Sequence, residues 1–348
     1  MNILAVHTAH DGSITIIKNN QFLLHAQIDR FSNLIASPMP PLKLLLKLKN
    51  LDIQFDTVLI SWLKDSTHWF WEDQLKKFNL IKPTGKILYI HKRDHHYFHT
   101  CCAKATVGES KHMVVIDGAG SPLPKGYEQE SIFKNNKIVF ASQQNIGADY
   151  ENKTKKVFNL KYIAFRSCGK LMALSAHKPD LNFFQKQTEE KIKRIMPKED
   201  VTYSGGVAQN VLVNSQFLNY KNFKIDPLCN DQGISLGVMY DHLKGKIKLP
   251  HPVYLGFEPK YNLESFQTRT VTPEEVCRLL RKEPVGIFQG RSEQGQRGLG
   301  NRSLLMDATH PKAVELVNKI KKREWFRPFA PAILEEYAHH YYEIEKPS

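Results

Sequence analysis

Short apolar runs separated by small polar turns dominate the first part of the chain. Three of them, rich in aliphatic and β-branched residues and bounded by turn signals, lie at residues 3–9, 13–18 and 21–28. The pair Asn19-Asn20 between the last two runs is typical of a tight β-hairpin. The same order returns, with Asn135-Asn136 at the hairpin, at residues 113–120, 127–134 and 137–144. The pattern predicts a structural duplication in which each copy contributes three strands.

Helical and strand patterns fill the chain between and after these copies. We expect helices at 40–50, from about residue 95, at 148–160 and at 182–196, and strands at 56–63 and 86–91. A strand, a Gly-Gly turn and a helix follow over residues 200–218. A stretch rich in Pro, Gly and Lys at residues 244–260 then indicates a domain boundary. We therefore expect an α/β domain at residues 1–250 and a second domain, with helices and strands of its own, at residues 251–348.

The bulk composition excludes several classes of protein. Apolar residues make up 41% of the 348 positions, which is enough for packed cores. No apolar run approaches the roughly 18 residues that span a bilayer, and the first residues show no signal-peptide pattern. The five cysteines have no CxxC spacing and no disulfide pattern, which fits a reducing compartment. We expect a cytoplasmic protein without membrane contact.

The net charge of the chain is strongly positive. It amounts to +14, from 49 Lys and Arg against 35 Asp and Glu, and it is spread along the whole length. Either this charge keeps the surface solvated, or it attracts a polyanion such as nucleic acid, a nucleotide or another phosphorylated substrate. Charge alone does not decide, because no aromatic-basic RNA motif and no helix-turn-helix pattern accompanies it.

Two glycine-containing turns are candidates for binding phosphate. In segment 204–210, Gly205 and Gly206 let the backbone approach an anion, and the expected helix turns its positive end toward it. Segment 116–120 places Asp117 beside a second such turn. A single glycine pair is more often a structural turn. Together with the duplication, the two turns favour a nucleotide held in a cleft between two related halves.

Three histidines within residues 95–99 raise the question of a metal site. His95 and His99 stand four apart and point the same way on a helix, although such a pair alone is more often part of a solvated face. Asp117 at a strand end is a candidate third ligand. Asp231, in a Gly-containing turn, is a candidate fourth and is equally suited to cap the following helix. Two imidazoles and two carboxylates suit iron, manganese or zinc better than magnesium.

Several of these segments occur in the order found in O-carbamoyltransferases, the enzymes of nodulation-factor synthesis and antibiotic tailoring, and the chain resembles that family over nearly its whole length. The first matching segments read HDGS, DRF, HHYFH, DGAG, GKLMALSA, SGGVAQN and NDQGISLG, at residues 10–13, 29–31, 95–99, 117–120, 169–176, 204–210 and 230–237. Two longer and more specific segments follow the expected boundary, at residues 290–305 and 318–334.

The resemblance implies a fold and a reaction. The first domain would be a duplicated actin-like fold of the RNase H-like class, similar to tRNA threonylcarbamoyl-transferases. The second would be a partial α/β domain of the YrdC-like class. In that family the second domain makes carbamoyl adenylate from carbamoyl phosphate and ATP with Mg(II). The first domain then transfers the carbamoyl group to an acceptor hydroxyl and releases AMP, which divides one difficult substitution into two easier ones.

The matching motifs also imply roles for single residues. The metal ligands would be His95, His99, Asp117 and Asp231, binding Fe(II) as a Lewis acid, with His96 incidental or supporting. His10 would be the general base for the acceptor hydroxyl, the alternative being a turn histidine bonded to backbone. The nucleotide would be contacted by Asp11, Gly12, Gly118, Gly205, Gly206 and Asn210. Carbamoyl phosphate and the triphosphate would be held by cationic side chains: the catalytic pair Lys321 and Arg323, with Arg291, Arg297, Arg302 and Arg327. Without the resemblance, such side chains on a basic surface are expected to face solvent.

The sequence departs from the family at three points. The Lys-x-Arg motif at 321–323 normally works with a later Ser-x-Asn, but the next serine here is Ser348. We therefore expect a strand-rich half of the second domain to be missing from this sequence: either a second polypeptide supplies it, or the sequence is a fragment, or the first reaction is lost. Only 28 residues separate Ala176 from Gly205, where relatives carry a long helical insertion near the acceptor. QIDRF and GQRGLG replace the family's EEERF and GPRALG, the latter with both flanking arginines kept.

We therefore expect an ATP- and iron-dependent O-carbamoyltransferase with an alcohol as acceptor. The short insertion and the net charge favour a phosphate-bearing acceptor, such as a hydroxymethylated base in DNA or its nucleotide, over a sugar or a neutral metabolite. One alternative is RNA modification of the threonylcarbamoyl-transferase type, against which the second-domain motifs argue. The other is a non-catalytic nucleotide-binding subunit of a split enzyme, against which the candidate metal ligands argue.

Overall fold

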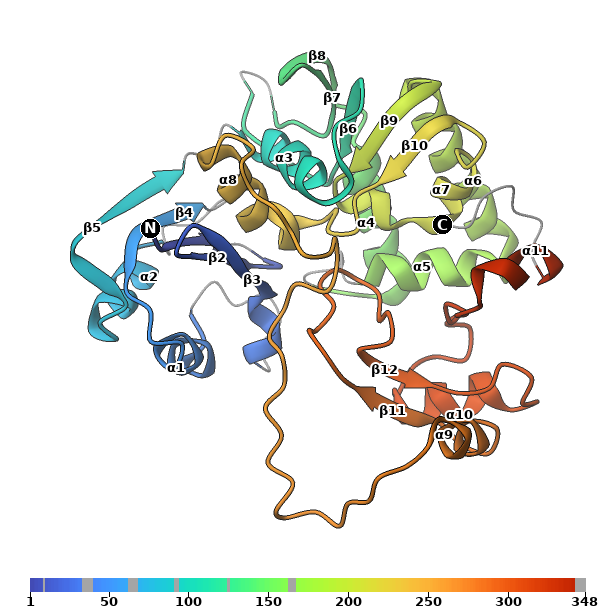
Figure 1. The fold of residues 1–348 in the computed structure, drawn as a ribbon. Helices are drawn as coiled ribbons and strands as arrows, with labels where there is room; N and C mark the ends of the chain where they lie inside the picture. The colour runs from blue at the N-terminus through green and yellow to red at the C-terminus, as the bar shows by residue number, and fades with distance from the viewer. Residues whose placement is uncertain are drawn as a thin grey trace.

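A five-stranded mixed sheet organises the first part of the chain (Figure 1). The structure is a computed structural model that describes residues 1–8, 10–32, 40–61, 68–90, 94–123, 126–161 and 167–341. The strands of the sheet are β1 (Ile3–His7), β2 (Ser13–Lys18), β3 (Gln21–Gln27), β4 (Phe55–Ser61) and β5 (Ile81–Ile90). Their order is β3-β2-β1-β4-β5. The first three strands pair antiparallel, and β4 and β5 extend the sheet parallel to β1.

A second sheet repeats this arrangement. Its strands are β6 (His112–Ile116), β7 (Glu130–Lys134), β8 (Lys137–Ser142), β9 (Glu199–Ser204) and β10 (Lys221–Ile225). They follow the same order and directions, with β6 in the place of β1. Each sheet also shifts register in its second strand just before an Asn-Asn turn, at Ile16/Ile17 and at Ile132/Phe133. All four turn asparagines have φ between 48° and 64°, the left-handed region that a tight hairpin requires. The predicted duplication is confirmed, and the connectivity is that of the actin-like fold.

Two helices cross between the halves. α3 (His95–Val107) follows β5 of the first sheet but packs on the second sheet, and α8 (Ile234–His242) follows β10 but packs on the first. The two helices contact each other at Gly237, where an added Cβ would lie 2.0 Å from the carbonyl oxygen of Phe98. Glycine is required here because the backbones meet directly.

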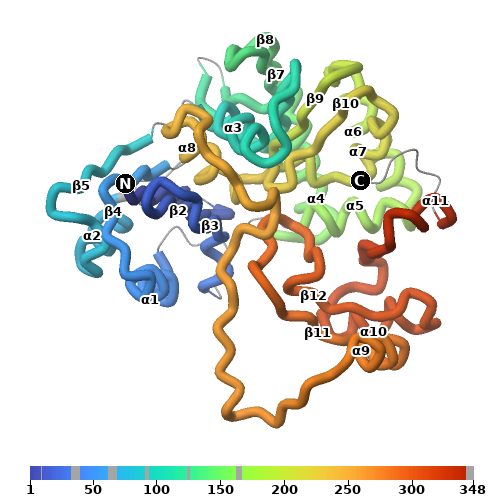
Figure 2. The backbone as a smooth tube through the Cα atoms, in the orientation of Figure 1, coloured from blue at the N-terminus to red at the C-terminus, as the bar shows by residue number. Residues whose placement is uncertain are grey.

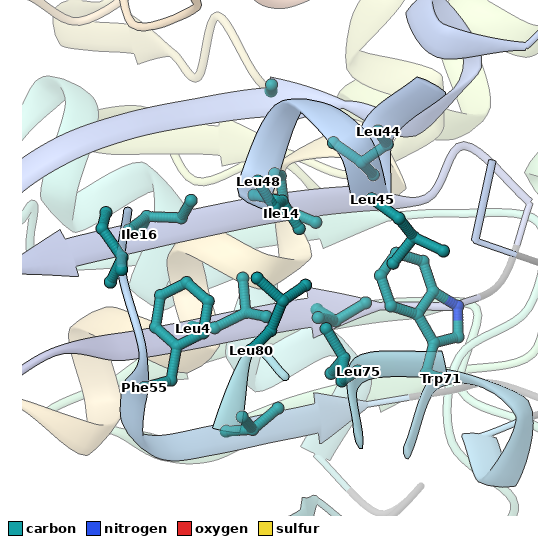
Figure 3. Close-up of a cluster of buried hydrophobic side chains, with 14 of the residues drawn as sticks. Leu4, Ile14, Ile16, Leu44, Leu45, Leu48, Phe55, Trp71, Leu75 and Leu80 are labelled. Atoms are coloured by element: carbon teal, nitrogen blue, oxygen red, sulfur yellow. The ribbon is translucent and has the colours of Figure 1, made fainter. Parts of the chain in front are cut away.

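The largest apolar core lies between the first sheet and two helices, α1 (Leu42–Lys49) and α2 (His68–Lys77) (Figure 3). Leu4 of β1 points into this core, whereas its neighbours Ile3 and Ala5 point to the other face and pack against α8. Trp71 of α2 is fully buried there. Because both faces of the sheet are covered, β1 is a continuous apolar run instead of an alternating one.

Three helices pack on the second sheet: α4 (Ile146–Phe158), α6 (Pro179–Ile195) and α7 (Val211–Ser215). A fourth, α5 (Cys168–Ser175), packs on α4 and α6. This part of the chain also has the 3-10 turns η1 (Ile28–Phe31), η4 (Gly206–Gln209) and η5 (Asp231–Gly233). The sequence pattern predicted α1, α3, α4, α6 and α8, but it missed α2, α5 and the short edge strand β10. Parts of the expected strands, at residues 9, 62–63 and 91, lie outside the described residues, as does Ser348.

The last part of the chain follows a long connection, drawn as the large orange loop in Figure 2. Its elements are α9 (Pro273–Leu280), the antiparallel pair β11 (Val285–Phe288) and β12 (Arg302–Leu305), α10 (Ala313–Ile320), η6 (Glu335–Tyr337) and α11 (Ala338–Tyr341). Leu255 lies past the expected boundary at 250/251, yet it is fully buried and packs against Cys102 and Leu236 of the first part. The two-domain division stays a prediction. No helix in the described part of the chain is both long enough and apolar enough to cross a membrane.

Candidate metal centre

His95 and His99 lie on the first turns of α3, where the two halves of the duplication meet. The Nε2 atoms of the two rings are 3.2 Å apart, and both side chains are buried. The start of the helix is held in place because the backbone N–H of His95 donates to the Ser121 hydroxyl at 3.0 Å. The expectation that these side chains share one face is confirmed, and that face is buried instead of solvated.

Asp117 follows β6, and its two carboxylate oxygens face different groups. Its Oδ1 accepts the backbone N–H groups of Gly118 at 2.7 Å and Gly206 at 3.3 Å. Its Oδ2 is left facing the imidazoles, 3.1 Å from His99 Nε2 and 3.5 Å from His95 Nε2. A Cβ at position 206 would lie 2.8 Å from Oδ1, so this approach needs glycine. The Gly-Gly turn therefore orients a candidate ligand.

Asp231 reaches the same point from the other half of the duplication. Its Oδ1 lies 3.4 Å from His95 Nε2 and 3.5 Å from His99 Nε2. Asp231 is the first residue of η5, and the N-cap positions of η5 and α8 are occupied by Asn230 and Gly233. The carboxylate of Asp231 faces the histidines, and its role as a metal ligand stays a prediction.

The charges of the four groups balance one another. Burial opposes protonation of His95, but the carboxylates of Asp231 and Asp117 outweigh it and raise the pKa of His95 to about 10. Burial and the same carboxylates act on His99, and its pKa is also raised. Burial also opposes ionisation of the two aspartates, yet the imidazoles hold the pKa of both carboxyls well below the ordinary range. Two buried negative charges are thus matched by two protons, which one divalent cation can replace.

The donor set fits a transition-metal ion. The candidate ligand atoms of His95, His99, Asp117 and Asp231 all lie within 4.8 Å of one another, and the measured separations that involve a ring nitrogen are 3.1–3.5 Å. Ligands bound about 2.1 Å from a small cation are separated by about 3–3.4 Å, so little movement is needed to accommodate one. Two imidazole nitrogens and two carboxylate oxygens suit iron, manganese or zinc. The cluster is therefore a possible metal site whose ion the structure does not identify.

Three further histidines surround this cluster. The His10 side chain is 45% exposed, and its Nδ1 lies 3.5 Å from Asp231 Oδ2. Burial lowers the pKa of His10, but the carboxylates of Asp231 and Asp11 outweigh burial and raise it to about 9. His96 turns away to Ser131 at 2.9 Å, and burial lowers its pKa to about 3. His7, at the end of β1, lies 3.9 Å from Asp231 Oδ2. Sequence reasoning missed His7, because a histidine that ends an apolar strand resembles a core residue.

The predicted nucleotide contacts are spread over several environments. Gly205 has a φ of +91° and donates its N–H to the Cys229 carbonyl, so it shapes the turn. The Asn210 side chain caps α7 by accepting the Val213 N–H at 3.2 Å. Gly118 has open space at its Cβ position. The nucleotide roles of these three residues, and those of Asp11, Gly12 and Gly206, stay predictions.

The six cationic residues of the last part fall into two groups. Arg302 donates to the carbonyls of Gln289, Gly290 and Asn301 and stacks on Phe288, and Arg291 donates to the Leu23 carbonyl at 2.8 Å. These two guanidiniums hold the loop together. The other four lie close together and form a cationic group: Arg297, Lys321, Arg323 and Arg327. Burial, and then the positive charges of neighbours in this group, lower the pKa of Lys321, Arg323 and Arg327; Arg297 is one of those neighbouring charges for Arg323 and Arg327.

A buried amide links this loop to the candidate metal centre. The Gln27 side chain donates to Gln232, next to Asp231, and to the Gly295 carbonyl at 3.2 Å. Its backbone N–H donates to the Gln294 side chain at 3.0 Å. A third contact joins the two parts at α5, where Lys170 pairs with Glu324 at 2.5 Å. The cationic group is thus anchored to the half that carries Asp231 and to α5.

Comparisons with known proteins relate part of the chain to a known family. Residues 276–348 match the family model for the carbamoyltransferase C-terminus. Nodulation protein U of Rhizobium fredii is 32% identical over 144 residues, which cover 39% of this chain and 25% of that protein. An uncharacterized protein of Synechocystis is 33% identical over 179 residues, 43% of this chain and 29% of that protein. These matches span less than a third of either relative.

Solved structures with related folds are much more distant. The activator of 2-hydroxyisocaproyl-CoA dehydratase from Clostridium difficile, with bound ADPNP, aligns with a TM-score of 0.40 at 12% identity, over 71% of this chain and 96% of that chain. MreB5 of Spiroplasma citri, bound to ADP, aligns with a TM-score of 0.37 at 10% identity, over 70% and 97% of the two chains.

Proposed function

We propose that this chain, which carries a carbamoyltransferase C-terminal domain and is distantly homologous to the nodulation proteins U and NolO, transfers a carbamoyl group to a hydroxyl. The carbamoyl group comes from carbamoyl phosphate and ATP through carbamoyl adenylate. One observation carries the proposal: both halves of the duplicated fold contribute to a single buried cluster of two imidazoles and two carboxylates. A nucleotide-binding scaffold has no need of such a set of ligands.

In this proposal His95, His99, Asp117 and Asp231 hold Fe(II). When bound, the ion supplies Lewis-acid polarisation of the carbamoyl carbonyl. Asp117 is kept in position by the Gly118 and Gly206 N–H groups, which leaves a single oxygen for coordination. Ser121 anchors the start of α3. Preorganised ligands of this kind remove the cost of rearrangement during the reaction.

His10 is the proposed proton acceptor for the attacking hydroxyl. Its ring is half exposed at the edge of the cluster, so an acceptor can reach it from solvent. The carboxylates of Asp231 and Asp11 raise its pKa and favour the protonated form that it reaches after accepting the proton. Neutralisation of Asp231 by a bound cation opposes this shift and moves the pKa toward the range of a working base.

The cationic group is the proposed site for carbamoyl phosphate and the triphosphate of Mg-ATP. Arg297, Lys321, Arg323 and Arg327 repel one another where they lie, and binding of a phosphate relieves that repulsion. The chain covers only a small share of its relatives, so formation of the adenylate in this chain alone or with a second chain is part of the proposal. Gln27 and Lys170 keep this group close to the metal cluster.

The proposed acceptor bears phosphate, such as a hydroxymethylated base in DNA or its nucleotide. Support comes from the net charge of +14 and from the short segment of 28 residues between Ala176 and Gly205, which leaves no room for a large acceptor-binding insertion. In the structure this segment forms only the single long helix α6 and strand β9.

The test uses the whole chain purified without oxygen. Labelled carbamoyl phosphate, ATP and Mg²⁺ are incubated with hydroxymethylcytosine DNA, its nucleotide, transcript RNA and a neutral sugar, and iron content is measured beside them. We expect near-stoichiometric iron and label in the DNA or nucleotide. Label in the sugar alone would overturn the acceptor class. Label in RNA would indicate an RNA-modifying enzyme. Absence of both iron and label would indicate a non-catalytic subunit.

A further inference from the structure

A hollow opens on the surface where α5 ends and α6 begins. It encloses about 430 Å³ and is lined by residues 175–179, which join the two helices, and by Asn182, Phe183 and Lys186 of α6. A volume of this size is in the range of small-molecule binding sites. None of the residues to which we assign a part in the reaction lines this hollow, so carbamoyl transfer at the metal cluster does not account for it.

Two aromatic side chains at the hollow are exposed to solvent. Phe183 is one of the lining residues and is 65% exposed. Trp325 is 70% exposed, and the centroid of its ring lies 5.0 Å from that of His177, which also lines the hollow. Because Trp325 belongs to the last part of the chain, both parts contribute an aromatic ring. Each ring offers a face on which a planar base can stack, whatever the identity of the base.

The charged side chains that line the hollow are cationic. They are Lys178 and Lys186, and neither forms an ion pair with another residue in the described part of the chain. Asp180, the acidic residue in the first turn of α6, is not one of the lining residues. Lysines without a counterion beside exposed aromatic rings are the combination with which proteins bind single-stranded nucleic acid, through its phosphates and its bases.

Helix α4 connects the hollow to the metal cluster and keeps the two apart. The helix begins beside Asp117, since an added Cβ at Gly147 would lie 2.6 Å from the carbonyl oxygen of Asp117. One turn later, Tyr150 of α4 packs against Leu171 of α5 and Leu181 of α6. A group bound in the hollow is therefore separate from the group that reacts at the cluster. One ligand occupies both places only if it is a chain of several units.

We propose that the hollow binds one nucleotide of a single-stranded acceptor DNA, some way along the strand from the hydroxyl that reacts. The inference rests on the transfer to a phosphate-bearing acceptor proposed above. The base stacks on Phe183 or Trp325, which requires that it is unpaired, and Lys178 and Lys186 contact the adjoining phosphates. Because α4 separates the hollow from the cluster, the acceptor is a strand and not a free nucleotide.

Binding is measured without any reaction, by the fluorescence of Trp325. Unmodified deoxycytidine oligonucleotides are titrated into the whole chain at several salt concentrations, and Trp325→Phe identifies the signal among the four tryptophans. We expect the strand to quench the wild type. Phe183→Ala should weaken binding about 5- to 150-fold, the loss of one stacked base. Lys178→Gln combined with Lys186→Gln should reduce the slope of log K against log salt by about 1.4, which is about 0.7 for each lost phosphate contact.

Two control variants make the same chemical changes elsewhere. Phe266→Ala removes a ring of the long connection that is 68% exposed. Lys43→Gln combined with Lys49→Gln removes two exposed charges of α1. Both controls should bind the strand like the wild type, and all variants should melt near the wild-type temperature because the changed side chains are exposed. Weakening by the controls equal to that of the hollow variants would mean binding by general surface charge, and would overturn the inference.

Transfer to oligonucleotides of increasing length separates this inference from the proposed function. The KM for hydroxymethylcytosine should fall with length until the strand reaches the hollow. Phe183→Ala should raise the KM for the long strand with kcat unchanged, and should leave the free nucleotide unaffected. Equal KM values for the nucleotide and the long strand would overturn the inference, although transfer itself would stand. Quenching by ATP but not by the strand would assign the hollow to ATP and overturn it as well. If no acceptor receives the carbamoyl group, the proposed function fails, and the titration still decides whether the hollow binds DNA.

Discussion

The contact between α3 and α8 at Gly237 controls the distance between the histidines and Asp231. His95 and His99 belong to α3, and Asp231 directly precedes α8. In Gly237→Ala the new methyl carbon would lie 2.0 Å from the Phe98 carbonyl oxygen, whereas ordinary contacts begin near 3.4 Å. The helices must therefore separate by about 1.4 Å at this point. Metal–ligand distances tolerate about 0.2 Å, so the cluster should lose its geometry.

Two energetic effects of this substitution oppose each other. Alanine in place of glycine inside a helix gains up to about 1 kcal/mol from helix propensity. Overpacking of a buried contact costs about 1–3 kcal/mol, and here the obstacle is backbone, which cannot rotate away. We expect a net destabilisation and a fall in iron affinity of about ten- to a hundredfold, the range for disturbed ligand support.

The assay combines chelator competition for iron with thermal melting. Gly169→Ala in α5 is the control, because its Cβ position has nothing within 4 Å and the same propensity gain applies. The control should bind iron like the wild type and melt at the same temperature or higher. If Gly237→Ala does the same, the close contact between the helices does not set the geometry of the cluster.

Three further predictions concern other parts of the fold. Burial lowers the pKa of His25 to about 4. As the pH falls, the unfolded chain therefore binds the proton before the folded chain does. The free energy of unfolding is then unaffected above about pH 6.5 and falls by about 3 kcal/mol toward pH 4. Urea unfolding at several pH values should show this loss in the wild type and less of it in His25→Phe. Trp71→Ala should cost about 3–5 kcal/mol while iron content stays unchanged, since Trp71 fills the apolar core (Figure 3) on the face of the first sheet that does not pack against α8. Arg297→Ala should raise the KM for ATP without a change in melting temperature. Arg302→Ala should lower the melting temperature, because the Arg302 guanidinium donates to loop carbonyls and stacks on Phe288. Equal effects of the two substitutions in both assays would contradict the division into two groups.

Much of the fold follows from local patterns. The six strands of the two repeated units were predictable because apolar residues recur between turn residues, and because asparagine pairs adopt the positive φ of a hairpin. Edge strand β10 escaped prediction, since its residues are half-exposed and mixed in polarity. α2 begins with bulky aromatic residues that favour no one periodicity, and its burial is decided by the sheet beneath it.

Local sequence by itself determined the strands, the hairpins and the pair His95 and His99 on one helical face. Only tertiary structure decided that Asp117 and Asp231 turn toward those rings, because their directions depend on Gly206 and on the crossing of α3 with α8. The same is true of His7, whose position near Asp231 depends on the register between β1 and β4 that pairs it with Ser61. Spacing along a chain sets the direction of a side chain within one element. The distance between atoms of different elements is set by packing, which no local pattern contains.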